Sequence, residues 1–261
     1  MEALINKELR LSRRLLLIWM GIVLILCGFA YFEYLSLKGS LGELAEMMQQ
    51  FPRILLVMFG VGEDLTSTLG WYGCIYYWVV ILDFSYAMYL GISCVAKEKA
   101  QGTAEYLFTK PVSRRRIVLA KAAAGVCNLL VLAVFSGLCN YFTAIAPLGG
   151  LEQKGAAITT TIGLFLTEAV LFSLGLLAAS LTKTYPGAVR LGTGLFVFFY
   201  CVSWTAEYWD APAWYYITPL KYFDVYAVAK NGLPFIFLLM SVVIFLTCLL
   251  LACRHWERRE L

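Results

Sequence analysis

Two carboxylic acids lie inside apolar runs of this sequence that are long enough to cross a bilayer. Asp83 lies in one run and Glu168 in another. A carboxylate at the centre of a spanning helix costs about 2.5–3.5 kcal/mol, so each is expected to face the interior of a helix bundle or a wet cavity. The two acids indicate either a proton or cation relay, or packing residues that are protonated or hydrogen-bonded to neighbours such as Tyr86 and Ser173.

A polar segment between two apolar runs has the residue order of a helix stop followed by two helix starts. Gly102 can end the preceding helix, and Thr103 can cap a new one in which Glu105 meets the positive end of the helix dipole. Pro111 ends that turn, and Ser113 can cap the next helix. We therefore expect a short helix over residues 104–109.

Three consecutive arginines, Arg114 to Arg116, follow this second cap. A helix N-terminus disfavours exposed cations by roughly 0.3–1 kcal/mol each. Anionic headgroups of the inner leaflet could offset this cost, and so could acidic groups on a docked protein. The residues alone leave both explanations open.

Catalytic motifs are missing from the sequence. It contains no GxxxxGK[ST], HExxH or GxSxG pattern, and its single histidine is His255. These absences exclude ATP binding by a P-loop and the commoner forms of metal or serine hydrolysis. The eight cysteines lack CxxC spacing, which favours packing roles. We expect no catalytic residue, cofactor or metal on this chain.

Composition indicates a membrane protein. The 261 residues are 61% hydrophobic and 15% charged, whereas soluble domains are roughly 45–50% apolar and 25% charged. A helix needs about 20 apolar residues to cross a bilayer. Six stretches meet or approach this length, at residues 15–32, 71–96, 117–146, 156–181, 187–206 and 233–253. The predicted fold is an all-α integral membrane protein, with residues 1–261 forming one domain of six transmembrane helices.

The placement of Lys and Arg predicts the orientation of this bundle. Six spans put both termini on one side, and sixteen of the 21 basic residues fall on that side, in residues 1–14, 97–121, 183–190 and 254–259. The positive-inside rule then makes both termini cytoplasmic, in a multi-pass protein of the cell membrane. Residues 1–14 carry separate apolar and basic stripes on a helical count, which predicts a short interfacial helix. The net charge of +4 is too small to indicate a nucleic-acid partner.

Two longer segments are predicted on the opposite side. In residues 33–70, Pro52 should start or bend a short helix, which suits a helical hairpin or re-entrant segment that caps the bundle. Residues 204–232 are rich in Trp and Tyr, which favours anchoring at the depth of the headgroups; gating of an outer exit is the alternative.

The segment after the second span resembles the corresponding loop of the permease subunits of ABC-2 type exporters. That loop typically reads as an acid, Gly-Thr, a second acid, a Leu-rich pair, Pro-Val-Ser-Arg, an apolar residue and then a Lys. The matching residues here are Glu98, Gly102, Thr103, Glu105, Leu107, Pro111, Val112, Ser113, Arg114, Ile117 and Lys121. Phe108 and Thr109 stand where relatives usually have Leu and Ser, which bears on details of docking. Residues 52–60 and 217–224 also agree with the family.

The resemblance implies a complex of two permease chains, either two copies or two homologues, with two ATP-binding subunits that hold ATP and Mg. It implies that the loop, residues 97–116, docks its short coupling helix in a cleft of the ATPase, beside the N-terminal helix. The docking residues would be Glu98, Gly102, Thr103, Glu105, Tyr106, Leu107, Pro111, Ser113, Arg114 and Arg115.

The function implied is export of an amphiphilic or apolar substrate, such as a peptide, lipid or drug. Two alternatives stay open: an ion-coupled secondary transporter that uses Asp83 and Glu168, and a non-transporting membrane scaffold or immunity component.

Overall fold

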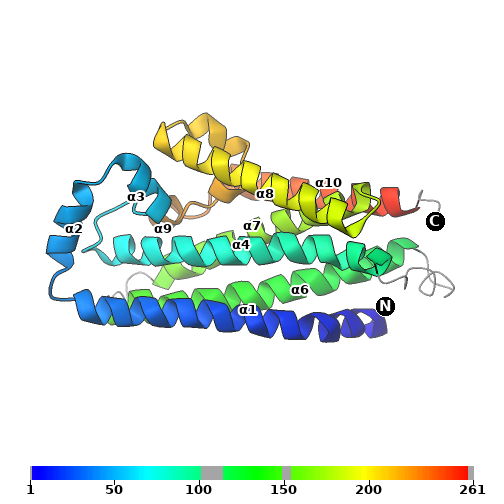
Figure 1. Cartoon of the computed structure of the whole chain (residues 1–261), viewed down its shortest axis with the longest axis horizontal. Coiled ribbons are helices and arrows are strands. Elements are labelled where there is room, and N and C mark those ends of the chain that lie inside the picture. Colours follow the sequence, from blue (N-terminus) through cyan, green and yellow to red (C-terminus); the bar gives the residue numbers. More distant parts are fainter. Residues whose placement is uncertain (1, 101–113, 149–153, 258–261) are drawn as a thin grey trace.

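The chain folds as a bundle of long helices. The computed structural model describes residues 2–100, 114–148 and 154–257, and within these ranges it contains helices and no strands. Six of the helices are long and apolar enough to cross a membrane, and they lie side by side along the long axis (Figure 1). They are α1 (Glu2–Leu37), α4 (Thr68–Ala100), α6 (Arg114–Asn140), α7 (Lys154–Leu181), α8 (Tyr185–Tyr208) and α10 (Phe235–Glu257). The predicted all-α membrane fold is confirmed.

Five of the six helices follow the predicted spans to within a few residues at each end. The helix after the loop continues through a π-helical turn (η1, Tyr141–Ile145) and a 3-10 turn (η2, Ala146–Leu148), so its apolar run ends near the predicted residue 146. The fifth span starts where Thr184 caps α8, accepting a hydrogen bond from the Gly187 N–H at 3.3 Å.

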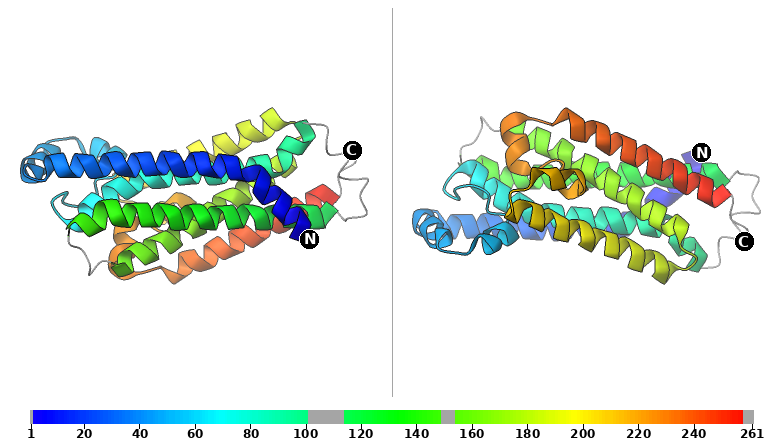
Figure 2. Two further views of the ribbon diagram at one scale, coloured as in Figure 1. Left: turned by 90° about the horizontal axis from the view of Figure 1, so that it is seen from below. Right: turned by 90° about the horizontal axis from the view of Figure 1, so that it is seen from above.

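The N-terminal region differs from the prediction of a separate interfacial helix at residues 1–14. Helix α1 runs without a break from Glu2 to Leu37 and bends near its start (Figure 2). No Pro or Gly occurs between residues 2 and 20, so nothing in the sequence ends the helix there. The Ser12 hydroxyl donates to the Glu8 carbonyl oxygen at 2.9 Å, a type of back-bonding that bends helices.

Helices α4 and α7 form the centre of the bundle. About two thirds of the residues in their most apolar stretches are buried, at 67% each, followed by 61% in the span that includes α6, 22% in α1 and α8 and 17% in α10. Their backbones lie in close contact at two glycines. A Cβ on Gly91 would overlap the Phe172 carbonyl oxygen, and a Cβ on Gly175 would lie 2.6 Å from the Met88 carbonyl oxygen. Small residues permit such close contact between membrane helices.

The two ends of the bundle are different. Both termini lie at one end, and the short helices α2 (Leu41–Gln49), α3 (Arg53–Phe59) and α9 (Val225–Asn231) lie at the other (Figures 1 and 2). The helix predicted after Pro52 is α3, which ends at Gly60 with a φ of 72°. Two 3-10 turns, η4 (Pro212–Tyr216) and η5 (Pro219–Lys221), connect α8 to α9.

The crossing of α4 and α7 predicts a large difference between two glycine-to-alanine changes. Gly91→Ala should lower the free energy of unfolding by about 1–3 kcal/mol, because the helices must separate to admit the methyl group. Gly194→Ala is the control, since a Cβ there meets nothing within 4 Å. Thermal unfolding of the purified protein in detergent measures both, and equal melting temperatures would contradict the close crossing.

Candidate functional site

An ion pair fastens the start of α1 to the start of α6. Lys121 Nζ lies 2.8 Å from Glu8 Oε1, and the Lys121 side chain is only 4% exposed. One turn further along α1, the Asn128 side-chain amide donates to Ser12 Oγ at 2.7 Å. We call these two contacts the α1–α6 clamp; they hold the N-terminal part of α1, which begins at the end of the bundle that carries both termini (Figure 1).

Most of the predicted docking residues lie outside the described part of the chain: Gly102, Thr103, Glu105, Tyr106, Leu107, Pro111 and Ser113. The short helix at 104–109 therefore stays a prediction. The residues on either side are placed: Glu98 belongs to the last turn of α4, Arg114 is the first residue of α6, and Arg115 is exposed. The loop thus joins two spanning helices at the end where the termini lie.

Asp83 and Glu168 lie together inside the bundle. Both side chains are fully buried, on α4 and α7 respectively, and they interact electrostatically with each other. Asp83 also faces Ser136 of α6. None of the four carboxyl oxygens, nor Ser136 Oγ, has a partner in hydrogen-bonding geometry among the described residues.

The neighbours expected to hydrogen-bond these acids do not do so. Tyr86 is near Glu168, but its hydroxyl has no hydrogen-bond partner among the described residues. Ser173 donates instead to the Val170 carbonyl oxygen of its own helix, at 2.7 Å. The acids are therefore unpartnered within the part of the chain that the structure describes.

A cavity of about 60 Å³ opens between α4, α7 and α8 at the end opposite the termini. Its lining includes seven aromatic residues and three charged ones. The aromatic lining comprises Tyr76, Tyr77, Phe84, Phe196, Tyr200, Phe223 and Tyr226, and the charged groups, which we call the charged mouth, are Glu207, Lys221 and Asp224.

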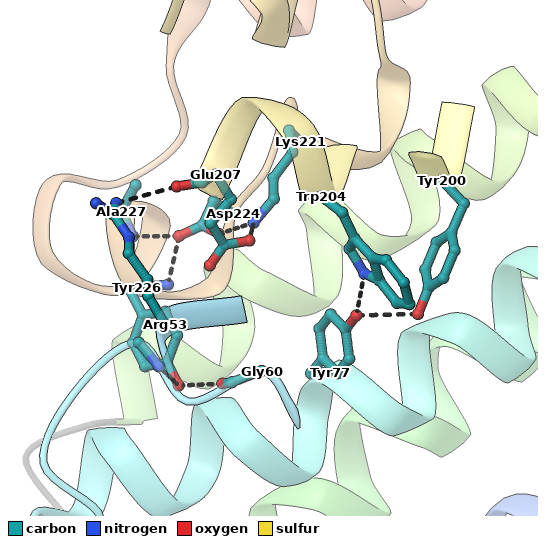
Figure 3. Close-up of polar contacts among 11 residues, drawn as sticks. Arg53, Gly60, Tyr77, Tyr200, Trp204, Glu207, Lys221, Asp224, Tyr226 and Ala227 are labelled. Carbon is teal, nitrogen blue, oxygen red and sulfur yellow. Dashed lines mark hydrogen bonds and ion pairs between the residues drawn. The ribbon is translucent and has the colours of Figure 1, made fainter. Parts of the chain in front are cut away.

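The charged mouth is centred on Lys221, whose side chain is 11% exposed (Figure 3). Lys221 Nζ lies 2.5 Å from Glu207 Oε2 and 3.1 Å from Asp224 Oδ2. Burial lowers the pKa of Lys221, but attraction to Asp224 and Glu207 outweighs it, so the pKa stays above its usual range. Asp224 also caps α9, accepting from the N–H groups of Tyr226 at 3.1 Å and Ala227 at 3.2 Å.

The segment around α3 closes over this mouth. Arg53 Nη2 donates to the Glu207 carbonyl oxygen at 3.1 Å. The Tyr226 hydroxyl donates to the Gly60 carbonyl oxygen at 2.8 Å and accepts from the Gly62 N–H at 3.1 Å (Figure 3). We call these contacts the α3–α9 network.

Two further contacts strengthen this end of the bundle. Lys230 forms an ion pair with Glu63, which ties α9 to the chain after α3. Inside the cavity wall, the Tyr77 hydroxyl lies 2.9 Å from the Tyr200 hydroxyl and accepts from Trp204 Nε1 at 2.7 Å (Figure 3).

Sequence reasoning did not single out the clamp or the α3–α9 network as pairs. The one local signal was Asp224 before a short helix, which is a typical N-cap residue. The other contacts join residues far apart in the chain, such as Glu8 and Lys121, and no spacing rule connects them.

The comparisons with known proteins give a family. The family model described as "ABC-2 family transporter protein" matches residues 2–211. The matched range includes the first five spanning helices, both buried acids and the loop between α4 and α6. No curated protein matches the chain.

The charged mouth predicts unequal roles for two lysines. Lys221→Met should lower the free energy of unfolding by about 1–3 kcal/mol, because Glu207 and Asp224 lose their shared cation. Lys230→Met should cost at most about 1 kcal/mol, since that lysine is 58% exposed. Melting temperatures in detergent measure both, and a Lys221→Met protein as stable as Lys230→Met would rule out this role.

Proposed function

The chain belongs to the ABC-2 transporter family, and we propose that it is the permease subunit of an exporter driven by ATP hydrolysis on a separate subunit. The family match over residues 2–211 is the observation that carries this proposal. The absence of a P-loop from the 261 residues supports an ATP site on another chain, which would also hold the Mg ion.

The ATP-binding subunit would dock at the end of the bundle that carries the termini. Two exposed groups of basic residues at this end support a cytoplasmic orientation. They are Lys7, Arg10, Arg13 and Arg14 at the start of α1, and Arg115 and Arg116 at the start of α6. The same cations could meet acidic groups of the docked ATPase or anionic headgroups.

Motion at the loop would reach the membrane through α4 and α6. These two helices emerge from the ends of the loop, and the α1–α6 clamp would make the N-terminal part of α1 move with α6. Because α4 packs closely on α7, a shift of α4 would also act on the buried acids and the cavity. The loop then works as a mechanical device, without catalysis.

The substrate pathway would open only when the helices move. The cavity of about 60 Å³ is far smaller than the roughly 300–1,000 Å³ of a drug-sized binding site. Its aromatic lining and charged mouth suit an amphiphilic substrate. The exposed apolar surfaces of α1, α8 and α10 are available to lipid and to a second permease chain, so the pathway would form between two copies in the cell membrane.

Two loop variants test the transmission of work. We expect Glu105→Lys and Pro111→Gly to uncouple transport from ATP hydrolysis while leaving membrane insertion intact, because they alter the first turn and the end of the predicted coupling helix. Glu46→Lys, on exposed α2 at the opposite end, is the control. The measurement is transport per ATP hydrolysed by the reconstituted complex. Normal coupling in both loop variants would refute the assignment, and so would failure to co-purify with any ATPase.

A charge exchange tests the α1–α6 clamp. Glu8→Lys and Lys121→Glu should each reduce coupled transport, because each places two like charges at a buried contact. The double variant Glu8→Lys/Lys121→Glu should recover most of the loss, because it restores opposite charges. If the loss of coupled transport in the double variant equals the sum of the losses in the two single variants, the pair does not transmit motion.

A further inference from the structure

The most unusual chemistry in the bundle is the pair of buried acids, and we propose that Asp83 and Glu168 form a proton-binding site inside the membrane. In the conformation described, both would carry a proton, and water reaching them through the cavity would exchange it. This proposal does not require that the chain be driven by ATP, so it can fail independently of the proposed function.

In the described part of the chain, the surroundings of the pair contain no compensating charge. Neither carboxyl interacts with a Lys, Arg or His side chain among the described residues. The titratable groups that do interact with the pair are Cys27 of α1, Tyr76 and Tyr86 of α4, and Cys139 of α6. All four are neutral in their protonated form, so none of them can balance a carboxylate. Two unpaired buried carboxylates are far too costly, and protonation is the direct way to remove both charges.

A proton suits this site better than a metal ion. No group of three or more His, Cys, Asp or Glu side chains that could hold a metal occurs in residues 2–100, 114–148 and 154–257. Calcium needs six to eight oxygen ligands, and magnesium needs near-octahedral geometry. The site offers two carboxyls and the unpartnered Ser136 hydroxyl facing Asp83. A proton needs only one carboxyl oxygen and no coordination shell.

The cavity leads from the end of the bundle to residues close to the pair in sequence, although neither acid lines it. Its lining includes Val80, about 4.5 Å before Asp83 along α4, and Leu164, about 6 Å before Glu168 along α7, at a rise of 1.5 Å per residue. A cavity of about 60 Å³ exceeds the roughly 10–15 Å³ that one water requires. Water in the cavity would therefore come within about one helical turn of both acids.

Protonation and the close packing of α4 on α7 depend on one another. An exposed carboxyl has a pKa of about 4, so the unfolded chain would release these protons above about pH 4. The folded bundle would still hold them. By linkage, proton binding then stabilises the fold in acid, and this stabilisation is lost as pH rises. Movement of α4 away from α7 would surround the carboxyls with more water than the cavity admits, so proton release would accompany opening of the bundle.

Infrared spectroscopy of the purified chain in lipid nanodiscs tests whether the acids are protonated. At neutral pH the wild type should show the carbonyl stretching band of a protonated carboxylic acid, with a shift in D₂O. Asp83→Asn and Glu168→Gln should each lose part of this band, and the double variant should lose it. Glu43→Gln, on the exposed surface of α2, should leave it unchanged. A wild type without the band, or a double variant that keeps it, would overturn the proposal.

The pH dependence of thermal unfolding gives a second test that needs no partner subunit. The melting temperature of the wild type should fall as pH rises from acidic to alkaline more steeply than that of Asp83→Asn/Glu168→Gln. The amides resemble protonated acids in shape, so the double variant should fold. Equal slopes would overturn the proposal. If the double variant does not fold, the wild-type band and its dependence on pH still decide.

A cavity-filling variant tests the route. Val80→Trp should slow the D₂O shift of the acid band several-fold, because the indole fills the cavity at a position about one helical turn before Asp83. Val134→Trp is the control, since Val134 is exposed on the surface of α6. An unchanged exchange rate in Val80→Trp would show that protons reach the pair by another path.

Discussion

The close crossing of α4 and α7 is the contact on which the rest of this structure depends. In a bilayer the lipid tails are as apolar as the side chains, so helices associate through close packing and not through removal of apolar surface from water. Gly91 and Gly175 let the two backbones meet, and the contact buries the middle of both helices. Asp83 and Glu168 are inside the protein because of this contact, and α6 completes the enclosure around Ser136. Helices α1, α8 and α10 lie outside this centre, and less than a quarter of the residues in their most apolar stretches are buried.

Much of this fold can be read from the sequence because hydropathy is a local property. The apolar runs predict the six helices, and Pro52 predicts the start of α3. The first helix departs from the prediction. Its expected boundary near residue 15 depends on a change in charge pattern. A change in charge does not end a helix unless a breaking residue accompanies it, and α1 continues through this region. Its bend depends on the Ser12 hydroxyl contact, which sequence alone does not reveal.

The sequence predicts a feature of the site only where every other arrangement would cost much free energy. The cost of an acid in lipid requires Asp83 and Glu168 to face inward, and both do. Their lack of hydrogen-bond partners among the described residues was not predictable, because nearness in sequence pointed to Tyr86 and Ser173. The ion pair of Lys221 with Glu207 depends on how the chain folds back after α8, which no local pattern encodes, whereas its partner Asp224 is only three residues away.

A single continuous helix connects the chemistry at three depths of the bundle. Helix α4 has 33 residues and no proline, and it is about 50 Å long. Its last turn borders the loop, its middle carries Asp83, and its first half contributes Gly73 and Tyr77 to the cavity wall. Gly73 packs directly on the Tyr226 ring, so α4 cannot slide along its axis without disturbing the α3–α9 network. In the proposed mechanism, a force on the loop would therefore act on the acid pair and on the closed mouth at once. Opening of the mouth and hydration of the acids would then be two consequences of one helix movement.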